Sequence, residues 1–468
     1  MYRELLKDTA IIGFGNIFSR GIVFFLIPLQ TSVMSKSEYG LAEMLFNLVS
    51  ILIPIFTLGI AEAGMRFAIG AKEDQEKVFS IITIVPFFGS AILLFLLAPV
   101  MFVYQEYREY CLSLIFLFFF FSYKDIYLQF CKGVNYLRIY ALGSILFSVS
   151  LLVLSYIFLV TNSYDVNGYI YSYVLANFVT VVYLLIYGRF YKYFAGIKDA
   201  FDIILCRLMV SYSLPLICNL LAWWITGISN RYVIAYYCTL EDVGVYSALA
   251  KFSLILTTIF GVFFQSWQIN AAKNINIKDR SSFFTKVHDI FIISLIIVSS
   301  IFLMFSGLIA SMFLRGGFVD SLQYLPGIVI TGTACCMPMY WGAIYGALKD
   351  TKGAFYSTFC GSIGSVLFNF LLIPAYGIYG AIASTVISYI IVTVYRAYEL
   401  NRMLEIRLSV GKNLCGFIVL AMQALGLSLC LSSVGSSLIN FISIVSILML
   451  YKTKIKDIFL CLLKIKKT

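Results

Sequence analysis

The feature that most constrains this chain is a succession of apolar runs, each about 20 residues long. An α-helix rises about 1.5 Å per residue, so such a run crosses the roughly 30 Å hydrocarbon core of a membrane. Only 12% of the 468 residues are charged, about half the fraction typical of a soluble domain. We therefore predict an all-α polytopic membrane protein with about 14 transmembrane helices. The predicted spans are 9–33, 40–66, 79–104, 111–131, 139–161, 168–189, 208–231, 242–268, 287–313, 322–347, 354–374, 378–398, 412–432 and 436–452.

The basic residues are distributed unevenly between alternate loops. If the N-terminus is cytoplasmic, 26 of the 34 Lys and Arg residues lie in inner segments, whereas the outer loops hold Lys36, Arg108 and Arg315. Basic residues favour the cytoplasmic side, so both termini are predicted to be cytoplasmic. The net charge of +11 is then a topology signal, and no nucleic-acid partner is expected. The first apolar run is too long for a cleavable signal peptide.

Residues that bind metals or cofactors are few and scattered. The 11 cysteines contain no CxxC pattern and lie mostly within spans, which argues against a disulfide or metal framework. His288 is the only histidine and is expected to be solvated near an inner helix end. No GxxxxGK[ST] loop is present, so ATP hydrolysis is not expected. We predict no cofactor, no metal and no enzymatic activity.

Two segments 204 residues apart resemble each other: "SKSEYGLAEMLFNLVSIL" (35–52) and "TLEDVGVYSALAKFSLIL" (239–256). The match alone is weak, because an acidic residue near a helix start is common. It is strengthened by the polar stripes that follow in both helices. Six spans separate the two helices, and an even number preserves orientation, so we predict two parallel six-helix lobes. The expected domains are an N-terminal lobe at 1–200, a C-terminal lobe at 201–400, and a helix pair with a basic tail at 401–468.

Several spans carry polar side chains along one face at helical spacing. Polar groups in hydrocarbon must be satisfied, so these stripes indicate a water-filled space or a close helix partner. The candidate substrate-binding residues are Asn16, Arg20, Asn47, Arg66, Lys124, Asn219, Lys251 and Gln265. The candidates for ion coupling or charge pairing are Glu43 and Asp125.

The charges in or near the spans are not balanced. The cations are Arg20, Arg66, Lys124, Arg231 and Lys251, and the anions are Glu43, Glu62 and Asp125. An uncompensated cation in hydrocarbon is costly, so an anionic ligand or a hydrated cavity would relieve this surplus. The alternative is pairing within the bundle, for example of Arg20 with Glu43, while Arg66 and Arg231 extend from span ends into water.

The residues also resemble a known family. The stretches "NIFSRGIVFFLIPLQTSVMSKSEYGLAEML", "LGIAEAGMRFAI", "SNRYVIAYYCTLEDVGVYSALAKFS", "FFQSWQINAAK" and "LIPAYGIYGAIASTVISY" are similar to those of Wzx-type polysaccharide repeat-unit flippases. That family belongs to the superfamily of MATE drug exporters and lipid II flippases. By resemblance, Arg66, Lys251 and Trp267 fall on family-typical positions. One departure is Asn230-Arg231, where the family pattern has an Asp before the Arg.

The resemblance implies a V-shaped pair of six-helix lobes around a cationic cavity. It implies a transporter that moves an undecaprenyl-diphosphate-linked oligosaccharide across the bacterial cytoplasmic membrane, for O-antigen, capsule or exopolysaccharide synthesis. Membrane lipids, a polysaccharide polymerase and a chain-length regulator are the expected partners. Energy would come from the membrane potential, or from protons or sodium coupled through Glu43 or Asp125.

Two other functions are consistent with a polytopic membrane protein. A MATE-like antiporter of small cations would need surplus carboxylates in its cavity, and this chain has the opposite charge balance. A membrane polysaccharide polymerase or ligase would need a substantial external loop for its catalytic groups, and every predicted outer loop is short. An inert scaffold would not explain the repeated polar stripes.

Overall fold

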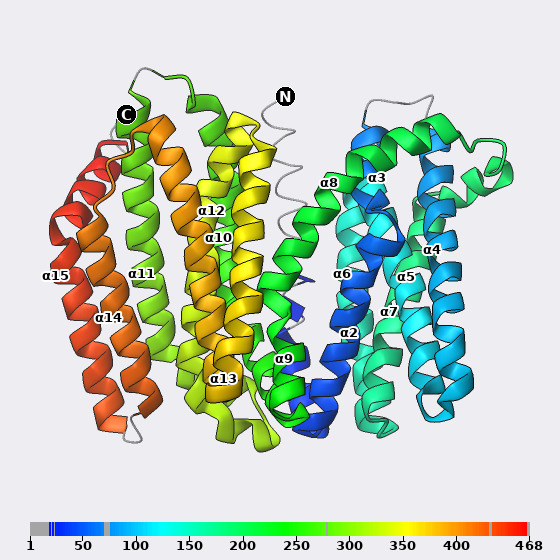
Figure 1. Ribbon diagram of the computed structural model, residues 1–468, viewed down its shortest axis with the longest axis horizontal. Helices are drawn as coiled ribbons and strands as arrows, with labels where there is room; N and C mark the ends of the chain where they lie inside the picture. Colours follow the sequence, from blue (N-terminus) through cyan, green and yellow to red (C-terminus); the bar gives the residue numbers. More distant parts are fainter. Residues whose placement is uncertain are drawn as a thin grey trace. The chain divides into compact units, whose positions relative to one another are not determined.

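The computed structural model of this protein describes residues 18–19, 21–22, 24–69, 75–277, 279–429 and 433–465, the side chains of 195, 433 and 455–465 excepted. Every regular element within these ranges is a helix (Figure 1). The elements are α2 Lys36–Phe56, α3 Ile60–Ala68, α4 Gln75–Val103, η1 Gln105–Tyr107, α5 Arg108–Gly133, α6 Leu137–Ser155, η2 Tyr156–Thr161, α7 Val166–Tyr187, η3 Phe190–Gly196, α8 Ile203–Ile228, α9 Asn230–Tyr237, α10 Leu240–Asn274, α11 Arg280–Phe313, η4 Gly316–Tyr324, α12 Leu325–Leu348, α13 Thr351–Leu404, α14 Val410–Leu429 and α15 Ser433–Ile465.

The predicted all-α membrane fold is confirmed. Among the described residues, 12 helices are long and apolar enough to cross a membrane. One of them, α13, contains two predicted spans, because the backbone at Gly377 has a non-helical φ of 54° and joins two helices across a kink. The short apolar helix Phe24–Val33 is the described part of the first predicted span. Each of the predicted spans thus has a helical counterpart.

The chain divides into two compact units, Met1–Trp224 and Ile225–Thr468. This division falls inside α8, whereas the sequence suggested a boundary near residue 200. In the first unit α5 contacts α2, α3, α4, α6 and α7. In the second unit α12 contacts α10, α11, α13 and α14. The helices α5 and α12 correspond to the fourth and tenth predicted spans, so each unit is built around the equivalent member of the proposed repeat.

The helix starts also support the repeat. Ser35 caps α2, and its side chain and that of Glu38 form a reciprocal capping box. Thr239 caps α10 in the same way with Asp242. The two boxes satisfy backbone N–H groups that have no partner within the helix. They lie 204 residues apart, at the offset found between the two sequence segments.

The second predicted span is two helices rather than one. Pro54 lies in the last turn of α2, and Leu58 and Gly59 have φ values of 53° and 58°, in the left-handed region. Two such residues in succession end the helix, and α3 then begins at Ile60. Gly59 faces Ile217 of α8, which a Cβ atom at position 59 would approach to 2.8 Å. The glycine at the break thus leaves room for the side chain of Ile217.

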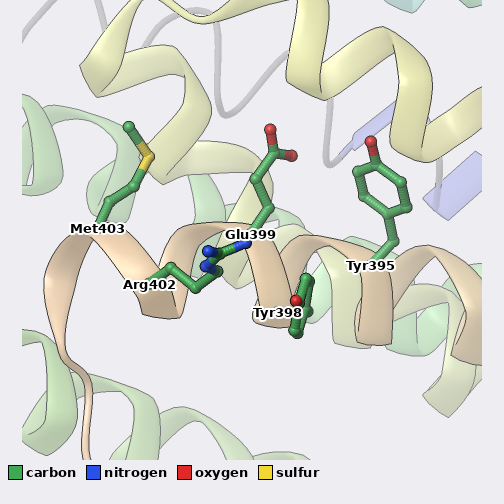
Figure 2. A pocket seen from close by; sticks show the side chains of 5 residues that line it. All are labelled: Tyr395, Tyr398, Glu399, Arg402 and Met403. Carbon is green, nitrogen blue, oxygen red and sulfur yellow. The ribbon is translucent and has the colours of Figure 1, made fainter.

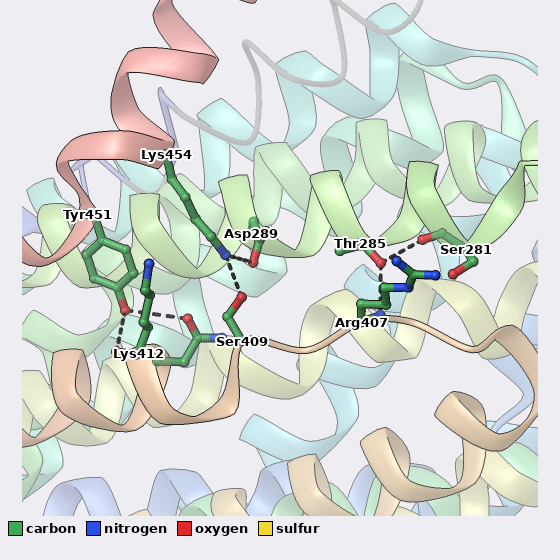
Figure 3. Close-up of polar contacts among 9 residues, drawn as sticks. Ser281, Thr285, Asp289, Arg407, Ser409, Lys412, Tyr451 and Lys454 are labelled. Carbon is green, nitrogen blue, oxygen red and sulfur yellow. Dashed lines mark hydrogen bonds and ion pairs between the residues drawn. The ribbon is translucent and has the colours of Figure 1, made fainter.

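The C-terminal helix pair is attached to the second unit by polar contacts near the connection between α13 and α14 (Figure 3). Lys454 Nζ of α15 lies 2.7 Å from Asp289 Oδ1 of α11 and 2.7 Å from Ser409 Oγ of the connection. The backbone N–H of Arg407 donates to Thr285 Oγ1 at 3.0 Å. These contacts, together with those between α11 and both α14 and α15, make the pair part of the second unit.

Candidate functional site

The sequence-predicted substrate residues lie on several helices. Asn16 and Arg20 lie outside the described residues. Asn47 lies on α2, Arg66 on α3, Lys124 on α5, Asn219 on α8, and both Lys251 and Gln265 on α10. The two carboxylates that were candidates for coupling, Glu43 and Asp125, lie on α2 and α5.

The polar stripe of α2 is a connected series of hydrogen bonds. Asn47 Nδ2 donates to the carbonyl oxygen of Glu43 at 2.7 Å, and Ser50 Oγ donates to that of Asn47 at 2.7 Å. Trp224 Nε1 of α8 then donates to Ser50 Oγ at 3.2 Å. A stripe of this kind keeps polar groups satisfied inside an apolar helix bundle.

Glu43 lies inside the first unit, with 3% of its surface exposed. Its Oε1 accepts hydrogen bonds from Tyr169 of α7 at 2.9 Å and from Tyr39 at 3.3 Å. The two phenols belong to helices that pack on each other, and their rings meet edge to face. The carboxylate is therefore held in a helix–helix contact, and its role in coupling stays a prediction.

Lys124 is also buried, with 8% of its surface exposed. Its Nζ lies 4.4 Å from the ring centroid of Phe121 and 4.3 Å from that of Phe147 on α6. The negative faces of aromatic rings attract a cation by about 0.5–2 kcal/mol, more when the pair is removed from water. The structure thus places Lys124 among aromatic rings rather than on a surface open to water. Asp125 next to it is half-buried, and the substrate role of Lys124 stays a prediction.

A second polar group lies where α3 meets α5. Gln129 Nε2 donates to Glu62 Oε1 at 3.0 Å, and Lys132 Nζ donates to Gln129 Oε1 at 3.1 Å. Lys132 also lies 4.5 Å from the ring centroid of Tyr140. Arg66, one turn beyond Glu62 on α3, is exposed. The C-terminal end of α3 therefore presents the positive charge of Arg66 at the surface. Beneath it, Glu62 and Lys132 carry opposite charges and are linked through Gln129.

The corresponding start of the second unit buries an arginine. Arg231 of α9 is 9% exposed. Its Nε donates to Ser247 Oγ of α10 at 3.0 Å and its Nη1 to the carbonyl oxygen of Gly227 at 3.3 Å, while Tyr246 covers the guanidinium at 5.4 Å. These partners are neutral. The prediction that Arg231 extends into water from a span end is wrong, because the turn between α8 and α9 directs it against α10.

Asn230 occupies the position where the family pattern has Asp. Its Nδ2 donates to the hydroxyl of Tyr246 at 2.6 Å and to Thr385 Oγ1 of α13 at 3.1 Å. The amide thus joins α9, α10 and α13 without adding a negative charge. The hydrogen-bond partners of Arg231 are accordingly a hydroxyl and a carbonyl group.

The stripe of α10 becomes more exposed along the helix. Ser247 is fully buried, Lys251 is half-buried, and Gln265 is exposed. On α2, Glu43 and Asn47 are buried and Ser50 is half-buried, and on α3 Arg66 is exposed, although Thr57 between them is buried. Asn219 of α8 is half-buried, and its Oδ1 has no hydrogen-bond partner among the described residues.

A pocket of about 360 Å³ lies beside the last turns of α13 (Figure 2). Tyr395, Glu399 and Met403 project from one side of the helix, with Tyr398 and Arg402 next to them. The guanidinium of Arg402 lies 5.6 Å from the ring centroid of Tyr398, and the hydroxyl of Tyr345 on α12 donates to Glu399. The sequence predicted for Arg402 only that it is one of the basic residues of the inner segments. Its helical spacing from Tyr395, Tyr398 and Glu399 is the signal that would have indicated a shared face.

Two other expectations concern aromatic neighbours. His288 is 6% exposed, so the prediction that it is solvated is wrong. It lies two turns inside α11 against the rings of Tyr340 and Trp341 of α12, at 5.0 and 5.5 Å. Trp267 stacks on Tyr340 at 5.2 Å and donates from Nε1 to its carbonyl oxygen at 2.9 Å, which is a packing role.

No group of three or more His, Cys, Asp or Glu suited to a metal occurs among the described residues.

The fold is that of a helical protein with many membrane-spanning segments. The chain is similar to a structure described as lipid II flippase MurJ in an inward closed conformation, with a TM-score of 0.69, 15% identity, and coverage of 95% of this chain and 99% of that one. It is also similar to an inward-facing multidrug resistance MATE transporter of the MOP superfamily, with a TM-score of 0.66, 13% identity, and coverage of 84% of this chain and 95% of that one. For a MATE transporter of Vibrio cholerae, VcmN, the TM-score is 0.60 and the identity 16%, with coverage of 86% of this chain and 97% of that one.

The family model described as polysaccharide biosynthesis protein matches residues 5–269, more than half of the sequence. The chain belongs to this family. Its fold is that of the MOP-superfamily transporters, as the resemblance implied. No curated protein sequence matches it significantly.

Proposed function

We propose that this protein carries an undecaprenyl-diphosphate-linked oligosaccharide repeat unit from the inner to the outer leaflet of a bacterial cytoplasmic membrane. Both termini are cytoplasmic in this proposal, and the polymer made from the repeat units is a surface polysaccharide. Membership of the polysaccharide biosynthesis family supports the substrate class. Similarity to a structure described as a lipid II flippase supports lipid-linked transport within this fold.

The observation that carries the proposal is the pair of polar stripes at equivalent places in the two units. On α10 the polar groups become more exposed from Ser247 to Gln265. On α2 they run from buried Glu43 to half-buried Ser50, and Arg66 is exposed on the following helix α3. A stripe of this kind suits a head group that must pass through hydrocarbon while its polyprenyl tail stays in lipid. We propose alternating access, in which the stripes take up the head group from one side and release it on the other.

The positive charges suit a diphosphate. Lys251 is half-buried in the α10 stripe, and Arg66 is exposed at the end of α3. Arginine binds phosphate oxygens through two parallel hydrogen bonds, and lysine binds them as a compact charge. We include Arg20, Asn16, Asn47 and Asn219 in the proposed site on their sequence positions. Lys124 enters it only if the phenyl rings of Phe121 and Phe147 move away from its ammonium group.

The pocket of α13 suits the glycan. Tyr395 and Tyr398 offer ring faces on which a sugar can stack, and Glu399 and Arg402 offer an acceptor and donors for its hydroxyl groups. The energy source that we propose is the membrane potential, worth about 2.3 kcal/mol per charge per 100 mV. The alternative source is a gradient of protons or sodium ions, coupled through Glu43 or Asp125. A polymerase and a chain-length regulator are the proposed protein partners.

The test is export of the polymer by cells in which the gene is replaced by a variant. Lys251→Ala should lower the amount of surface polysaccharide about tenfold, equivalent to about 1.4 kcal/mol, and should cause lipid-linked repeat units to accumulate inside. Lys273→Ala is the matched control, because Lys273 is an exposed lysine near the end of the same helix. Membrane levels of each variant are measured by immunoblot. Normal export by Lys251→Ala would contradict the proposal.

The same strains separate the alternatives. A MATE-like antiporter would change resistance to small cationic drugs and leave the polymer unchanged. A polymerase or ligase would leave repeat units on the outer leaflet, where an impermeant periodate treatment reaches them. Accumulation on the inner leaflet is the result expected for a flippase.

A further inference from the structure

The first unit has an apolar groove that lies apart from the polar stripes. It has a volume of about 680 Å³ and is bounded by α4, α5, α7 and the segment after η3. Its floor is formed by Tyr123, Tyr127 and Val181, which are all buried. Its rim is formed by Phe87, Phe88 and Phe178, whose surfaces are between 42% and 62% exposed. The groove is therefore open towards the side of the unit, with aromatic walls.

The groove is already shaped without a ligand. Phe79 of α4 stacks on Tyr127 at 5.5 Å, and on its other sides it contacts Tyr193 and Phe194 of η3 at 5.0 and 5.7 Å. The hydroxyl of Ser80 donates to the carbonyl oxygen of Ile197. These contacts hold the segment after α7 against α4. A preformed site loses little conformational entropy when a ligand binds.

The floor offers an apolar ligand no competing hydrogen-bonding group. The hydroxyl of Tyr123 donates to the carbonyl oxygen of Thr83 at 2.7 Å, and that of Tyr127 lies 3.4 Å from Thr83 Oγ1. The polar atoms of the floor thus satisfy one another within the protein. What remains accessible is hydrocarbon, which suits an aliphatic chain rather than a sugar or a peptide backbone.

The polar end of the groove carries one positive charge. Lys198 lines it and is exposed. It forms no ion pair with a described residue, whereas nearby Lys77 lies 3.5 Å from Asp202. The segment 189–207 contains four basic residues and two acidic ones, and the sequence predicts that it faces the cytoplasm. Basic residues at a cytoplasmic membrane surface attract anionic lipids by about 1 kcal/mol each.

The length of the groove agrees with one leaflet. The lining residues of α5 extend from Phe119 to Tyr127, which is about 12 Å along the helix axis. Half of the hydrocarbon core is about 15 Å deep. We propose that this groove binds an anionic phospholipid of the leaflet next to Lys198, with one acyl chain between α4 and α7 and the phosphate at Lys198.

The experiment is native mass spectrometry of the full-length protein in detergent, with phosphatidylglycerol and phosphatidylethanolamine added in equal amounts. Wild type should retain phosphatidylglycerol preferentially, and Lys198→Ala should lower its retention about fivefold. Lys192→Ala is the matched control, because Lys192 is an exposed lysine of η3 outside the groove. Equal retention by the two variants, or equal retention of the two lipids by wild type, would overturn the proposal.

A second pair of variants tests the acyl chain. Ile84→Trp should fill the groove and lower the retention of phosphatidylglycerol, whereas Ile92→Trp on an exposed part of the same helix should not. Folding of both is checked by thermal unfolding, and if Ile84→Trp does not fold, the lysine pair decides. Undecaprenyl phosphate is added in a separate arm. If it replaces phosphatidylglycerol at lower concentration and depends on Lys198, the groove serves the polyprenyl chain and the proposal is overturned.

Discussion

Single charged residues inside the helix bundle are stabilised in two different ways. Lys124 is surrounded by phenyl rings, so its charge is met by the negative faces of Phe121 and Phe147. Arg231 instead donates to a hydroxyl and a carbonyl oxygen and is covered by Tyr246. The rings, hydroxyl and carbonyl groups that these two side chains contact carry no negative charge. This arrangement agrees with the cationic character that the sequence predicts for the spans.

We expect the hydroxyl of Ser247 to be essential for the position of the Arg231 side chain. Ser247→Ala removes the acceptor of Arg231 Nε in a fully buried place, and an unsatisfied buried donor costs about 1–3 kcal/mol. The melting temperature of the purified protein in detergent should therefore fall. Ser266→Ala on the exposed face of the same helix is the control. Equal melting temperatures for the two variants would show that Arg231 is held by other contacts.

Helices in each unit approach each other where one of them has a small residue. Gly89 of α4 lies against the backbone of α2, and a Cβ atom built there would come within 2.2 Å of the Phe56 carbonyl oxygen. Gly380 meets the backbone around Leu372 in the same way, across the kink of α13. Close backbone approach through small residues is a principal source of helix association in membranes, where burial of apolar surface gives little driving force.

We expect the substitution Gly89→Ala to push helix α4 away from helix α2. The backbone of Phe56 cannot move aside as a flexible side chain would, so we expect a loss of about 1–3 kcal/mol in the free energy of unfolding. Gly307→Ala on α11 is the matched control, because its Cβ would meet nothing within 4 Å. Alanine also favours a helix over glycine, so that control should unfold at the same or a higher temperature. A Gly89→Ala protein as stable as the control would contradict the close contact.

The start of α8 is fixed by a local device. Asp202 Oδ1 accepts hydrogen bonds from the backbone N–H groups of Leu205 and Ile204 at 3.1 and 2.9 Å. These donors, the Leu205 N–H foremost, together with Lys77, lower the pKa of the Asp202 carboxyl. Because this pKa is lowered by folding, the stabilisation is present at neutral pH and is lost as the pH falls through the lowered pKa. The helix that leads from the first unit into the second therefore has a defined beginning.

The whole molecule consists of two units built to the same plan. Capping boxes open α2 and α10, 204 residues apart, and α5 and α12 each contact at least four other helices of their own unit. The additional pair α14 and α15 is joined to the second unit through Asp289, Lys454 and Ser409. In the parallel repeat that the sequence predicts, both units have the same orientation in a membrane, and the distribution of basic residues predicts which side is cytoplasmic.

At the scale of the whole molecule, we expect residues 163 and 198 to lie on opposite sides of the membrane. Alkaline phosphatase, which is active only outside the cytoplasm, should be active when fused after Ser163 and inactive when fused after Lys198. Green fluorescent protein fused after Thr468 should fluoresce, because it matures in the cytoplasm. The reverse pattern would overturn the predicted orientation of every span and the side of the membrane that Lys198 faces.

Much of the fold could be predicted because its signals are local. A run of apolar residues has the same cost in water wherever it occurs in the chain, so the spans and the starts of α2 and α10 follow from the sequence. The break after Phe56 was not predicted, because Leu58 is apolar and only its backbone conformation ends the helix. The burial of His288 was not predicted either, because its surroundings come from Tyr340 and Trp341 of another helix.

From the amino-acid sequence alone, the chain is recognisable as a helical membrane protein with repeated polar stripes and an excess of positive charge. The partner of each polar group became known only from the folded structure. Glu43 meets Tyr169, and Lys124 meets Phe147 of the neighbouring helix α6. The pocket around Arg402 and the groove beside Lys198 were likewise visible only in the folded chain. The physical reason is that hydropathy is a property of one segment, whereas the partner of a buried charge is set by which helices pack together.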